Sequence, residues 1–230
     1  MEDREPNAMA DATRAVPLVV PLEGVLCRTG LATERRVQAI AADPGAALTG
    51  SILRGTVPPL PPEALPLDDA VLERVRAARA AGRQVILVTG EDAPQARVVS
   101  DRLGLFDDVI AGVPAGPLRE ARLAEAAPGA EILGATPRPS GTARWRARIR
   151  AMRPHQWSKN LLILLPLLAA HDMGGFGAAL AAFVAFSLTA SSVYVLNDIA
   201  DLAADRAHPR KRRRPFASGE VSVAEGLQLA

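Results

Sequence analysis

The sequence predicts a two-part chain, in which an α/β domain with a parallel sheet precedes an α-helical transmembrane hairpin. Residues 15–143 alternate short apolar runs with amphipathic ones, the pattern of a sheet covered by helices. Residues 154–205 contain two longer apolar runs joined by a short connector. The two parts also differ in charge. We expect residues 1–14 to be disordered, 15–143 to form the α/β domain, and 144–230 to begin the membrane domain.

The charge difference lies between the C-terminal part and the rest of the chain. From Arg144 to Arg214 there are twelve basic residues against four acidic ones, a balance of +8, and because the whole chain is +2 the remainder sums to −6. Attraction for phosphate or anionic lipid therefore belongs to the C-terminal part. Cys27 is the single cysteine, which excludes an internal disulfide and is compatible with a reducing compartment. Residues 1–16 lack the apolar core of a signal peptide, so we expect the α/β domain to be cytoplasmic.

The elements of the α/β domain follow from its periodicity. The helix expected over Asp69–Ala80 has its apolar residues on one face and Gly82 where it would stop, and Ala93–Leu103 repeats this design. The proline-rich stretch Val57–Pro66 predicts an extended connection. The predicted strands are the short apolar runs Leu18–Leu22, Val85–Val88, Val109–Ile110 and Glu131–Leu133.

Two of these strands end in residues that bear on chemistry. The first runs into Pro21-Leu22-Glu23-Gly24 and the second into Thr89-Gly90. This arrangement resembles the haloacid-dehalogenase-like (HAD-like) superfamily, in which the first strand ends in Asp-x-Asp-Gly-Thr and the second in Ser or Thr. The resemblance implies that Pro21 stands at the nucleophile position. A pyrrolidine ring neither attacks phosphorus nor ligates magnesium, which excludes covalent phosphoryl catalysis there.

The remaining motifs of that superfamily are also altered. Its phosphate-neutralising Lys would fall near Arg119, and its final acidic pair should follow Leu133-Gly134 but meets Ala135-Thr136-Pro137-Arg138-Pro139. Thr89 alone is intact, so we expect a catalytically inactive HAD-like domain. Glu23 leaves two alternatives open: it binds a cation, or, as is commoner for a lone carboxylate at a strand end, it is solvated or caps a turn.

The membrane hairpin is predicted from length and flanking charge. Gly174–Leu196 contains no charged residue and is about twenty residues long, enough to cross a bilayer core of roughly 30 Å. Leu161–Ala170 is about half a span, and reaches a marginal crossing if counted from Trp157 with Lys159 snorkelling. Arginines precede the first run and follow the second, so both flanks are expected on the cytoplasmic side of a multi-pass protein of the cell membrane. Small residues within the second run favour packing in a larger bundle over a bare anchor.

An aspartate-rich motif follows the second run directly. If the helix continues, Asp198, Asp201 and Asp205 lie on one face, with Asn197 one turn from Asp201. Like charges at this spacing repel one another, so the pattern predicts a bound cation, and hard oxygen ligands beside a membrane suit Mg²⁺. The basic residues just downstream are suited to the oxygens of a diphosphate.

The two motifs of this part resemble the UbiA prenyltransferase superfamily. The pattern Asn-Asp-x-x-Asp-x-x-x-Asp, followed by His-Pro-x-Lys-x-x-Arg-Pro, is similar to its first aspartate-rich motif. The stretch from Arg153 to Asn160 is similar to the Arg-Pro-x-Gln-Trp-x-Lys-Asn of the subgroup that contains decaprenyl-phosphate phosphoribosyltransferase, some members of which have an N-terminal HAD-like domain. The resemblance implies Mg²⁺-dependent transfer of a prenyl or phosphoribosyl group, with a polyprenyl lipid and a diphosphate substrate such as phosphoribosyl pyrophosphate as partners.

Carried onto this sequence, the resemblance also implies a set of site residues. The metal ligands would be Asp198, Asp201 and Asp205, and the substrate-binding residues would be Asn197, Lys159, Lys211 and Arg214. The superfamily needs further membrane helices and a second aspartate motif, so we expect this chain to be C-terminally truncated and inactive by itself.

A different class of function remains open beside this one. A membrane-anchored pseudo-phosphatase that acts as a scaffold would need the hairpin only as an anchor, and downstream sequence with more apolar segments and another Asp-rich loop would distinguish the two. Nucleic-acid binding is disfavoured, because the second arginine run abuts an apolar span and no aromatic residues interleave it.

Overall fold

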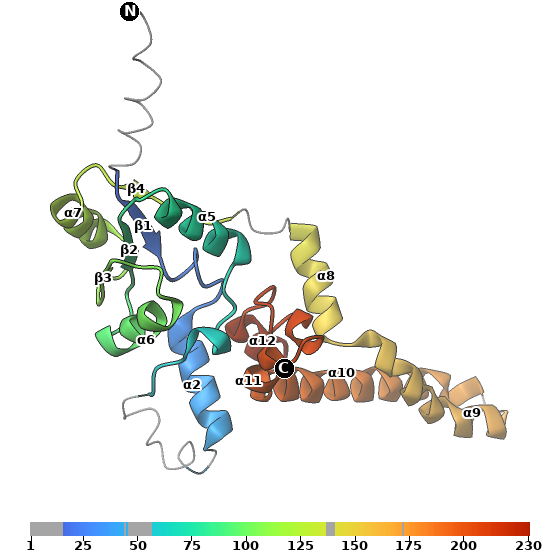
Figure 1. Ribbon diagram of the computed structural model, residues 1–230. Coiled ribbons are helices and arrows are strands. Elements are labelled where there is room, and N and C mark those ends of the chain that lie inside the picture. The colour runs from blue at the N-terminus through green and yellow to red at the C-terminus, as the bar shows by residue number, and fades with distance from the viewer. Residues whose placement is uncertain (1–15, 44, 46–56, 137–140, 172) are drawn as a thin grey trace, which may run out of the picture. The chain divides into compact units, whose positions relative to one another are not determined.

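The computed structural model of the chain (Figure 1) describes residues 16–43, 45, 57–136, 141–171 and 173–230. The expectation for residues 1–14 lies outside these residues. Contacts divide the chain into two compact units, Met1–Arg138 and Pro139–Ala230.

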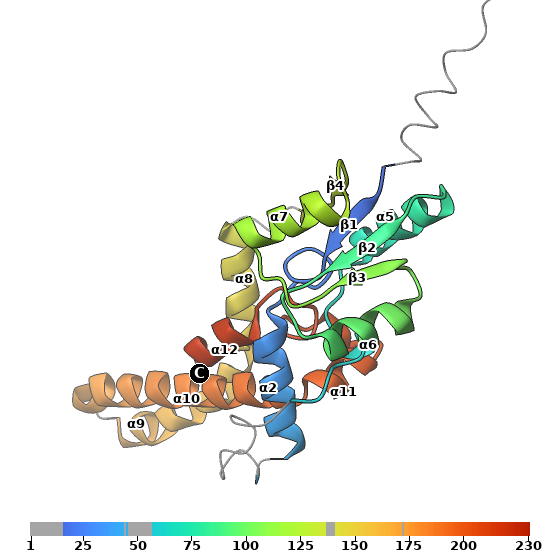
Figure 2. The same ribbon diagram turned by 90° about the vertical axis from the view of Figure 1, so that its left-hand side faces the viewer.

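The first unit contains a four-stranded parallel sheet, which confirms the predicted α/β class. The strand order is β3-β2-β1-β4, and each pair of neighbouring strands is parallel (Figure 2). Two predicted strands end one residue early, but the next residue in each keeps a ladder hydrogen bond, from Leu22 N to Val88 O at 2.8 Å and from Leu133 N to Val19 O at 2.8 Å. The strands are β1 (Leu18–Pro21), β2 (Val85–Val88), β3 (Asp108–Ile110) and β4 (Glu131–Ile132).

Helices cover both faces of this sheet because successive side chains of its central strands point to opposite sides. On one face, Leu18, Val20, Val85 and Leu87 pack with the apolar side of α5 (Asp69–Ala80). On the other face, Val19, Ile86 and Val88 pack with Leu123 of α7 (Pro117–Ala126). Figure 1 shows α5 and α7 on opposite sides of the strands. Burial on both faces accounts for strands that read as continuous apolar runs.

The two predicted helices have the expected ends. α5 is capped by Asp68, which accepts from Ala70 N at 3.0 Å, and it stops before Gly82 at φ 75°. α6 (Ala93–Leu103) ends at Gly104 in the left-handed conformation at φ 61°. A residue with a Cβ is strained at such an angle, so these glycines fix the helix ends. Two helices were not anticipated, α2 (Leu31–Ala42) and α7, and the connection expected to be extended contains the 3-10 turn η1 (Pro62–Ala64).

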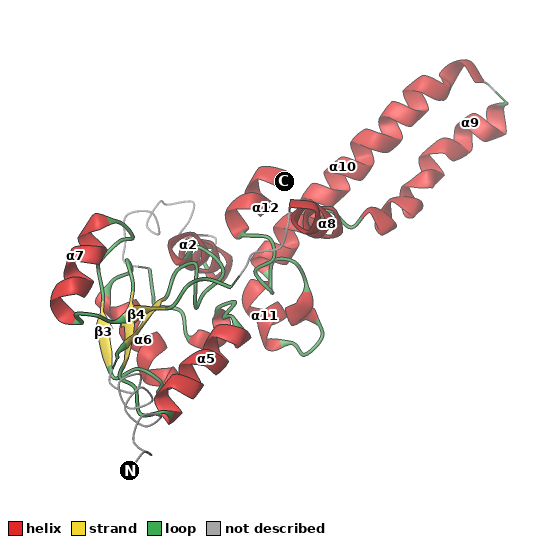
Figure 3. Cartoon of the chain, turned by 90° about the horizontal axis from the view of Figure 1, so that it is seen from above, coloured by secondary structure: helices red, strands yellow, loops and turns green. Residues whose placement is uncertain are grey.

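The second unit is helical and contains two antiparallel arms. The first arm joins the 3-10 helix η2 to α9, and the second is α10, which lies beside it in Figure 3. Two side-chain contacts set their register: Trp157 Nε1 donates to Ser191 Oγ at 2.9 Å, and Asn160 Nδ2 donates to Ser187 Oγ at 3.0 Å. The elements are α8 (Gly141–Ala151), η2 (Pro154–Leu164), α9 (Leu165–Ala170), η3 (Met173–Gly175), α10 (Phe176–Ala200), α11 (Leu202–Ala207), η4 (Lys211–Arg213) and α12 (Val223–Leu229).

Among the described residues, α10 is the only helix long and apolar enough to cross a membrane. It has 25 residues, against the 23 predicted from Gly174 to Leu196, and large apolar side chains such as Phe186 and Val193 are more than half exposed along it. The first apolar run, Leu161–Ala170, is not a single α-helix, because Leu161 to Leu164 belong to the 3-10 helix and α9 has only six residues.

The C-terminal helix α12 packs at a glycine against the end of α10 that carries the aspartate motif. A Cβ added to Gly226 would stand 2.5 Å from Phe216 Cε1 and 2.7 Å from Ile199 Cδ1. Both of those side chains are buried, so a methyl group at this position would displace atoms of the unit's interior. Ser222 and Glu225 form a reciprocal capping box at the start of α12, which fixes where this helix begins.

Candidate functional site

The four residues of the aspartate motif divide into a buried pair and an exposed pair. α10 ends at Ala200, and Asp201 stands between α10 and α11, with the turn continued by a bond from Asp205 N to Asp201 O at 2.8 Å. Asp198 and Asp205 are buried, at 5% and 1% exposure, whereas Asn197 and Asp201 are exposed. Residues seven apart return to nearly the same side of a helix, which is why Asp198 and Asp205 come together.

Arg214 joins the two buried carboxylates. Its Nη1 lies 2.7 Å from Asp205 Oδ2 and 3.2 Å from Asp198 Oδ1. Arg214 stands directly after the short helix η4, which packs against α11. The structure thus places Arg214 beside two aspartates of the motif, whereas the resemblance implied a contact with substrate phosphate, which stays a prediction.

Arg153 is a second cation of this site, and no role had been assigned to it from the sequence. Its Nη2 donates to Asp198 Oδ1 at 2.5 Å, and its guanidinium lies 5.3 Å from the centre of the Tyr194 ring. The backbone of Arg153 is left-handed, at φ 52°, where the chain turns from α8 into η2. The signal that pointed to it was its place in the Arg-Pro-x-Gln-Trp stretch, but its partner is 45 residues away in the sequence.

Lys211 completes a group that we call the Asp198–Asp205 cluster, formed by Arg153, Asp198, Asp205, Lys211 and Arg214. Lys211 Nζ lies 3.7 Å from Asp205 Oδ1, which is too long for a hydrogen bond, and that buried oxygen has no hydrogen-bond partner among the described residues. Two carboxylates against three cations give the cluster a formal charge of +1. Cationic side chains thus offset the repulsion between the aspartates, a role that we expected from the sequence for a bound metal ion.

The fit of Mg²⁺ to these residues rests on the free oxygen of Asp205. A buried carboxylate oxygen without a donor is the kind of hard ligand that Mg²⁺ takes, and exposed Asp201 lies one turn away on the same segment. Within the described ranges, no three His, Cys, Asp or Glu side chains are gathered closely enough to hold a metal ion. The predicted ligand set Asp198, Asp201 and Asp205 is therefore not brought together as a group in this arrangement.

The other two predicted substrate contacts lie outside the cluster. Lys159 is an exposed residue of η2, and Asn197 is an exposed residue of α10 whose backbone oxygen accepts from Asp201 N at 2.9 Å. Neither side chain forms a hydrogen bond or an ion pair with Arg214 or the buried aspartates in the described part of the chain. Of the seven residues predicted for the site, four form the cluster or touch it directly: Asp198, Asp205, Lys211 and Arg214.

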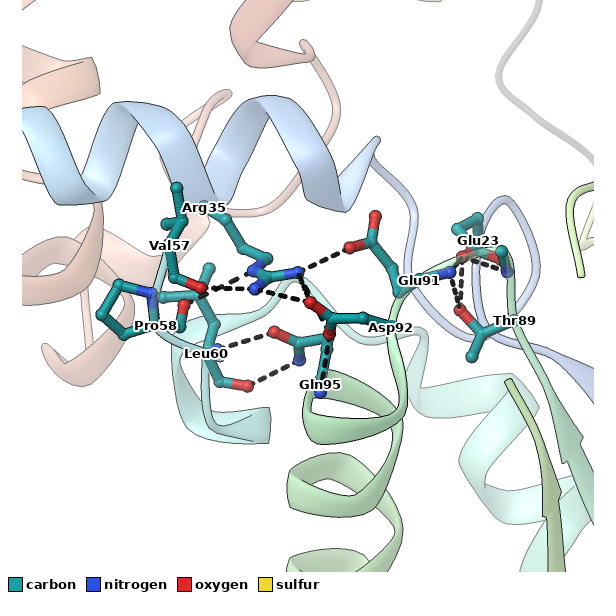
Figure 4. Close-up of polar contacts among 10 residues, drawn as sticks. Glu23, Arg35, Val57, Pro58, Leu60, Thr89, Glu91, Asp92 and Gln95 are labelled. Atoms are coloured by element: carbon teal, nitrogen blue, oxygen red, sulfur yellow. Dashed lines mark hydrogen bonds and ion pairs between the residues drawn. The ribbon is translucent and has the colours of Figure 1, made fainter. Parts of the chain in front are cut away.

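In the α/β unit, Glu23 is held by the loop that follows β2. Its Oε1 accepts from the Thr89 hydroxyl, from Gly90 N at 2.9 Å and from Glu91 N at 3.2 Å (Figure 4). Arg119 Nη2 lies 3.5 Å from the other oxygen. A carboxylate thus satisfies the hydroxyl and backbone donors of this loop, which is closer to the turn-capping alternative for Glu23 than to a solvated one.

The same loop is fixed from its other side by Arg35 of α2. Arg35 Nη1 lies 2.9 Å from Glu91 Oε2, and its Nη2 lies 3.3 Å from Asp92 Oδ2 and also donates to the Val57 carbonyl (Figure 4). Gln95 adds two bonds to the backbone of Leu60, at 2.7 and 2.9 Å. These contacts hold α2, the connection before α5 and the β2–α6 loop together, so their evident role is structural.

Glu225 of α12 forms an ion pair with both Arg144 and Arg148 of α8, each at 2.6 Å. Burial raises the pKa of Glu225, but the Ser222 backbone donor and the two guanidinium groups outweigh it and lower the pKa to about 2. The carboxylate is therefore ionised at neutral pH and fixes α12 to α8 within the second unit.

Comparison with known proteins identifies relatives of both parts of the chain. A protein of Sinorhizobium fredii described as uncharacterized protein y4nM is 33% identical over 214 residues, which cover 72% of this chain and 40% of that protein. The C-terminal unit makes up residues 139–230 alone, so that match includes part of the α/β unit as well. No solved structure gives a significant match.

The decaprenyl-phosphate phosphoribosyltransferases match the C-terminal part. That of Mycolicibacterium smegmatis is 51% identical over 89 residues, 36% of this chain and 28% of the enzyme, and that of Mycobacterium tuberculosis is 48% identical over 82 residues, 32% and 26% respectively. The chain thus spans less than half the length of the curated relatives it matches. Residues 161–230, which include α10 and four of the five residues of the Asp198–Asp205 cluster, match the UbiA prenyltransferase family.

Proposed function

We propose that this chain contains the first half of the diphosphate site of a membrane transferase, which moves a phosphoribosyl group onto a polyprenyl phosphate with Mg²⁺. The observation that supports it best is the Asp198–Asp205 cluster at the end of the long apolar helix. Similarity to the phosphoribosyltransferases over the same residues favours phosphoribosyl over prenyl as the transferred group.

The chemistry of the cluster supports a diphosphate ligand. Mg²⁺, when bound, would link carboxylate oxygens to diphosphate oxygens and neutralise their charge. Arg214 and Lys211 already hold their charged groups at the carboxylates. Guanidinium and ammonium groups bind phosphate oxygens as well as carboxylate oxygens. The excess positive charge of the cluster favours an incoming anion, and exposed Asp201 and Asn197 offer further oxygens at its edge.

The proposed hairpin is supported by the geometry of its first arm. At about 2.0 Å per residue, the eleven residues of η2 extend about 22 Å, and the six of α9 add about 9 Å. The total of about 31 Å is comparable with a bilayer core of roughly 30 Å. The 3-10 conformation thus lengthens an arm that would be too short as an α-helix, which supports a protein that crosses the membrane more than once. The arginines that flank both arms favour a cytoplasmic α/β unit.

The α/β unit is proposed to be a scaffold without catalytic activity. Pro21 stands at the end of β1 where the HAD-like resemblance implies a nucleophile, and the Glu23 carboxylate already takes the Thr89 hydroxyl. This contact is also what favours the second candidate, a membrane-anchored pseudo-phosphatase in which the helical unit is only an anchor. The two candidates differ in whether the Asp198–Asp205 cluster is needed for any activity.

The test is a transfer assay with radiolabelled phosphoribosyl pyrophosphate and polyprenyl phosphate in detergent. It uses the product of the complete reading frame that contains these residues, with and without Mg²⁺. We expect Asp198→Ala and Asp201→Ala each to reduce transfer at least about 100-fold, because losing one charge-stabilising contact typically costs that much. Lys211→Ala should have a milder effect, since Arg214 still contacts Asp205.

The matched control is Asp101→Ala, which removes one exposed carboxylate from α6 of the other unit. Transfer that survives Asp198→Ala as well as it survives Asp101→Ala would contradict the site assignment. Absence of any transfer, with or without Mg²⁺, would favour the anchored scaffold instead.

A further inference from the structure

Helix α8 presents an apolar stripe that the described residues of its own unit leave exposed. Trp145 and Ile149, one turn apart, are 62% and 49% exposed, whereas Ala147 and Ala151 on the opposite side are buried at 3% and 1%. The buried side faces the unit, since α8 contacts α10 and bonds to α12 through Glu225. The orientation of α8 is therefore fixed, with Trp145 and Ile149 on its outer face.

Arginines border this stripe on both sides. In a helix, Arg144 and Arg148 lie along one edge of the Trp145–Ile149 stripe, and Arg146 and Arg150 lie along the other. Arg148 also stacks on the Trp145 ring, with its Cζ 5.6 Å from the ring centre. An aromatic and an aliphatic side chain between two rows of long cationic side chains is the arrangement of a helix lying in a membrane interface.

The charges of α8 select the kind of surface. The sequence from Gly141 to Ala170 contains no acidic residue. Arg144, Arg148 and Arg150 have carboxylate partners on the α12 side, but Arg146 makes no ion pair within the described part of the chain and is exposed. Positive charge therefore remains at the edge of the apolar stripe, where it complements an anionic surface.

We propose that α8 binds the surface of an anionic lipid bilayer, with Trp145 and Ile149 inserted among the headgroups and Arg146 at lipid phosphates. Arg150 joins it there, because its ion pair with Glu220 is solvent-exposed and a lipid phosphate can replace the carboxylate. Only two residues, Met152 and Arg153, separate the end of α8 from the arm that begins at Pro154. The inference thus rests on the proposed membrane location of that arm and α10. The proposal adds that α8 lies parallel to the bilayer surface, in contact with its headgroups.

The experiment measures the depth of Trp145 in vesicles. The chain has two tryptophans, so Trp157→Phe leaves Trp145 as the single fluorophore. The 230-residue chain is reconstituted into phosphatidylcholine vesicles with or without phosphatidylglycerol, containing lipids brominated near the headgroup or near the acyl-chain end. We expect Trp145 emission to be quenched mainly by the shallow bromines, and more strongly with phosphatidylglycerol present.

Charge removal tests the role of the arginines. Arg146→Gln with Arg150→Gln should weaken docking of α8 about 30-fold and so remove most of the shallow quenching, because each such residue near an anionic surface contributes about a fivefold preference. The matched control, Arg74→Gln with Arg97→Gln, makes the same change in net charge at exposed positions of α5 and α6. It should leave quenching unchanged.

A second reporter separates this proposal from the membrane location of α10. Phe186→Trp, with Trp145 and Trp157 both changed to Phe, reports the depth of α10 at an exposed position. If this reporter is quenched by deep bromines while Trp145 is not quenched, the proposal for α8 is wrong and the membrane location stands. If neither is quenched, the membrane location itself fails. Equal quenching of Trp145 with and without phosphatidylglycerol, or equal effects of the two arginine pairs, would overturn the anionic-surface assignment.

Discussion

Arg214 is the residue whose loss should disturb the second unit most. It is the shared partner of two carboxylates whose side chains are 6% and 1% exposed, Asp198 and Asp205. In Arg214→Gln, Asp198 keeps Arg153, but Asp205 keeps only Lys211 at 3.7 Å. Removing one partner of a buried ion pair costs about 3–5 kcal/mol, since it leaves an uncompensated buried charge. Because Lys211 remains, we expect a loss near the lower end, about 3 kcal/mol of unfolding free energy.

The assay is reversible unfolding in mixed micelles, followed by the fluorescence of Trp157 after Trp145→Phe. Trp157 reports the packing of the two arms, since its indole donates to Ser191. The matched control is Arg213→Gln, which removes an exposed neighbouring charge and should change stability by less than about 0.5 kcal/mol.

A double variant tests whether Arg214 compensates the charge of Asp205. Arg214→Gln combined with Asp205→Asn removes the buried charge together with its partner, so it should be less destabilising than Arg214→Gln alone. If Arg214→Gln is no worse than Arg213→Gln, or if the effects of Arg214→Gln and Asp205→Asn simply add, then Arg214 does not compensate Asp205 and the cluster is wrongly described.

Four other outcomes follow from the structure. Gly226→Ala should lower the unfolding free energy by about 1–3 kcal/mol in the same assay, because an added methyl overlaps two buried side chains. The pKa of Glu225 is lowered from 4.5 to about 2, so its stabilisation is complete above about pH 4.5 and is lost as pH falls towards 2; a Glu225→Gln variant should lack this part of the acid dependence, and an unchanged acid profile would contradict the pairing with α8. The α/β unit should show no Mg²⁺-dependent hydrolysis of generic phosphate esters, and turnover abolished by Glu23→Ala would disprove its inactivity. Topology reporters inserted after Ala143 and after Gly219 should both be cytoplasmic, whereas reporters on opposite faces would mean that the first arm does not cross.

The sheet was predictable from the sequence because its central strands are buried on both faces. β2 was predicted to the residue, since Val85 to Val88 form an uninterrupted apolar run between polar residues. Helices α5 and α6 were predictable for a similar reason, as each has an apolar face and a glycine at its end. α7 was missed because Leu123 is its single buried residue, so it has little periodic signal.

The sequence could predict which residues lie near the candidate site, but not which side chains form ion pairs there. The spacing of Asp198 and Asp205 follows from helix geometry, and the downstream basic residues were expected beside them. The role of Arg153 depends on a contact with a residue on another element, and no local pattern encodes which side chain a guanidinium will reach across a fold. The 3-10 conformation of η2 was likewise unpredictable from periodicity, because its apolar residues read equally well as one turn of an α-helix.

The arginine contacts change what the aspartate motif means physically. From spacing alone, three carboxylates on one helix end require a cation, and a metal is the simplest candidate. Arg153 and Arg214 meet that requirement for Asp198 and Asp205 without any metal, so the motif is compatible with a stable fold before any ligand binds. A metal that takes the oxygens held by these arginines, Asp198 Oδ1 and Asp205 Oδ2, must release the arginines, and a guanidinium released beside the cluster needs another anion. A metal and a diphosphate arriving together meet both needs, one at the carboxylates and the other at the guanidinium groups, whereas either alone leaves charge uncompensated. The geometry therefore favours joint binding of cation and polyanion over binding of a metal ion alone.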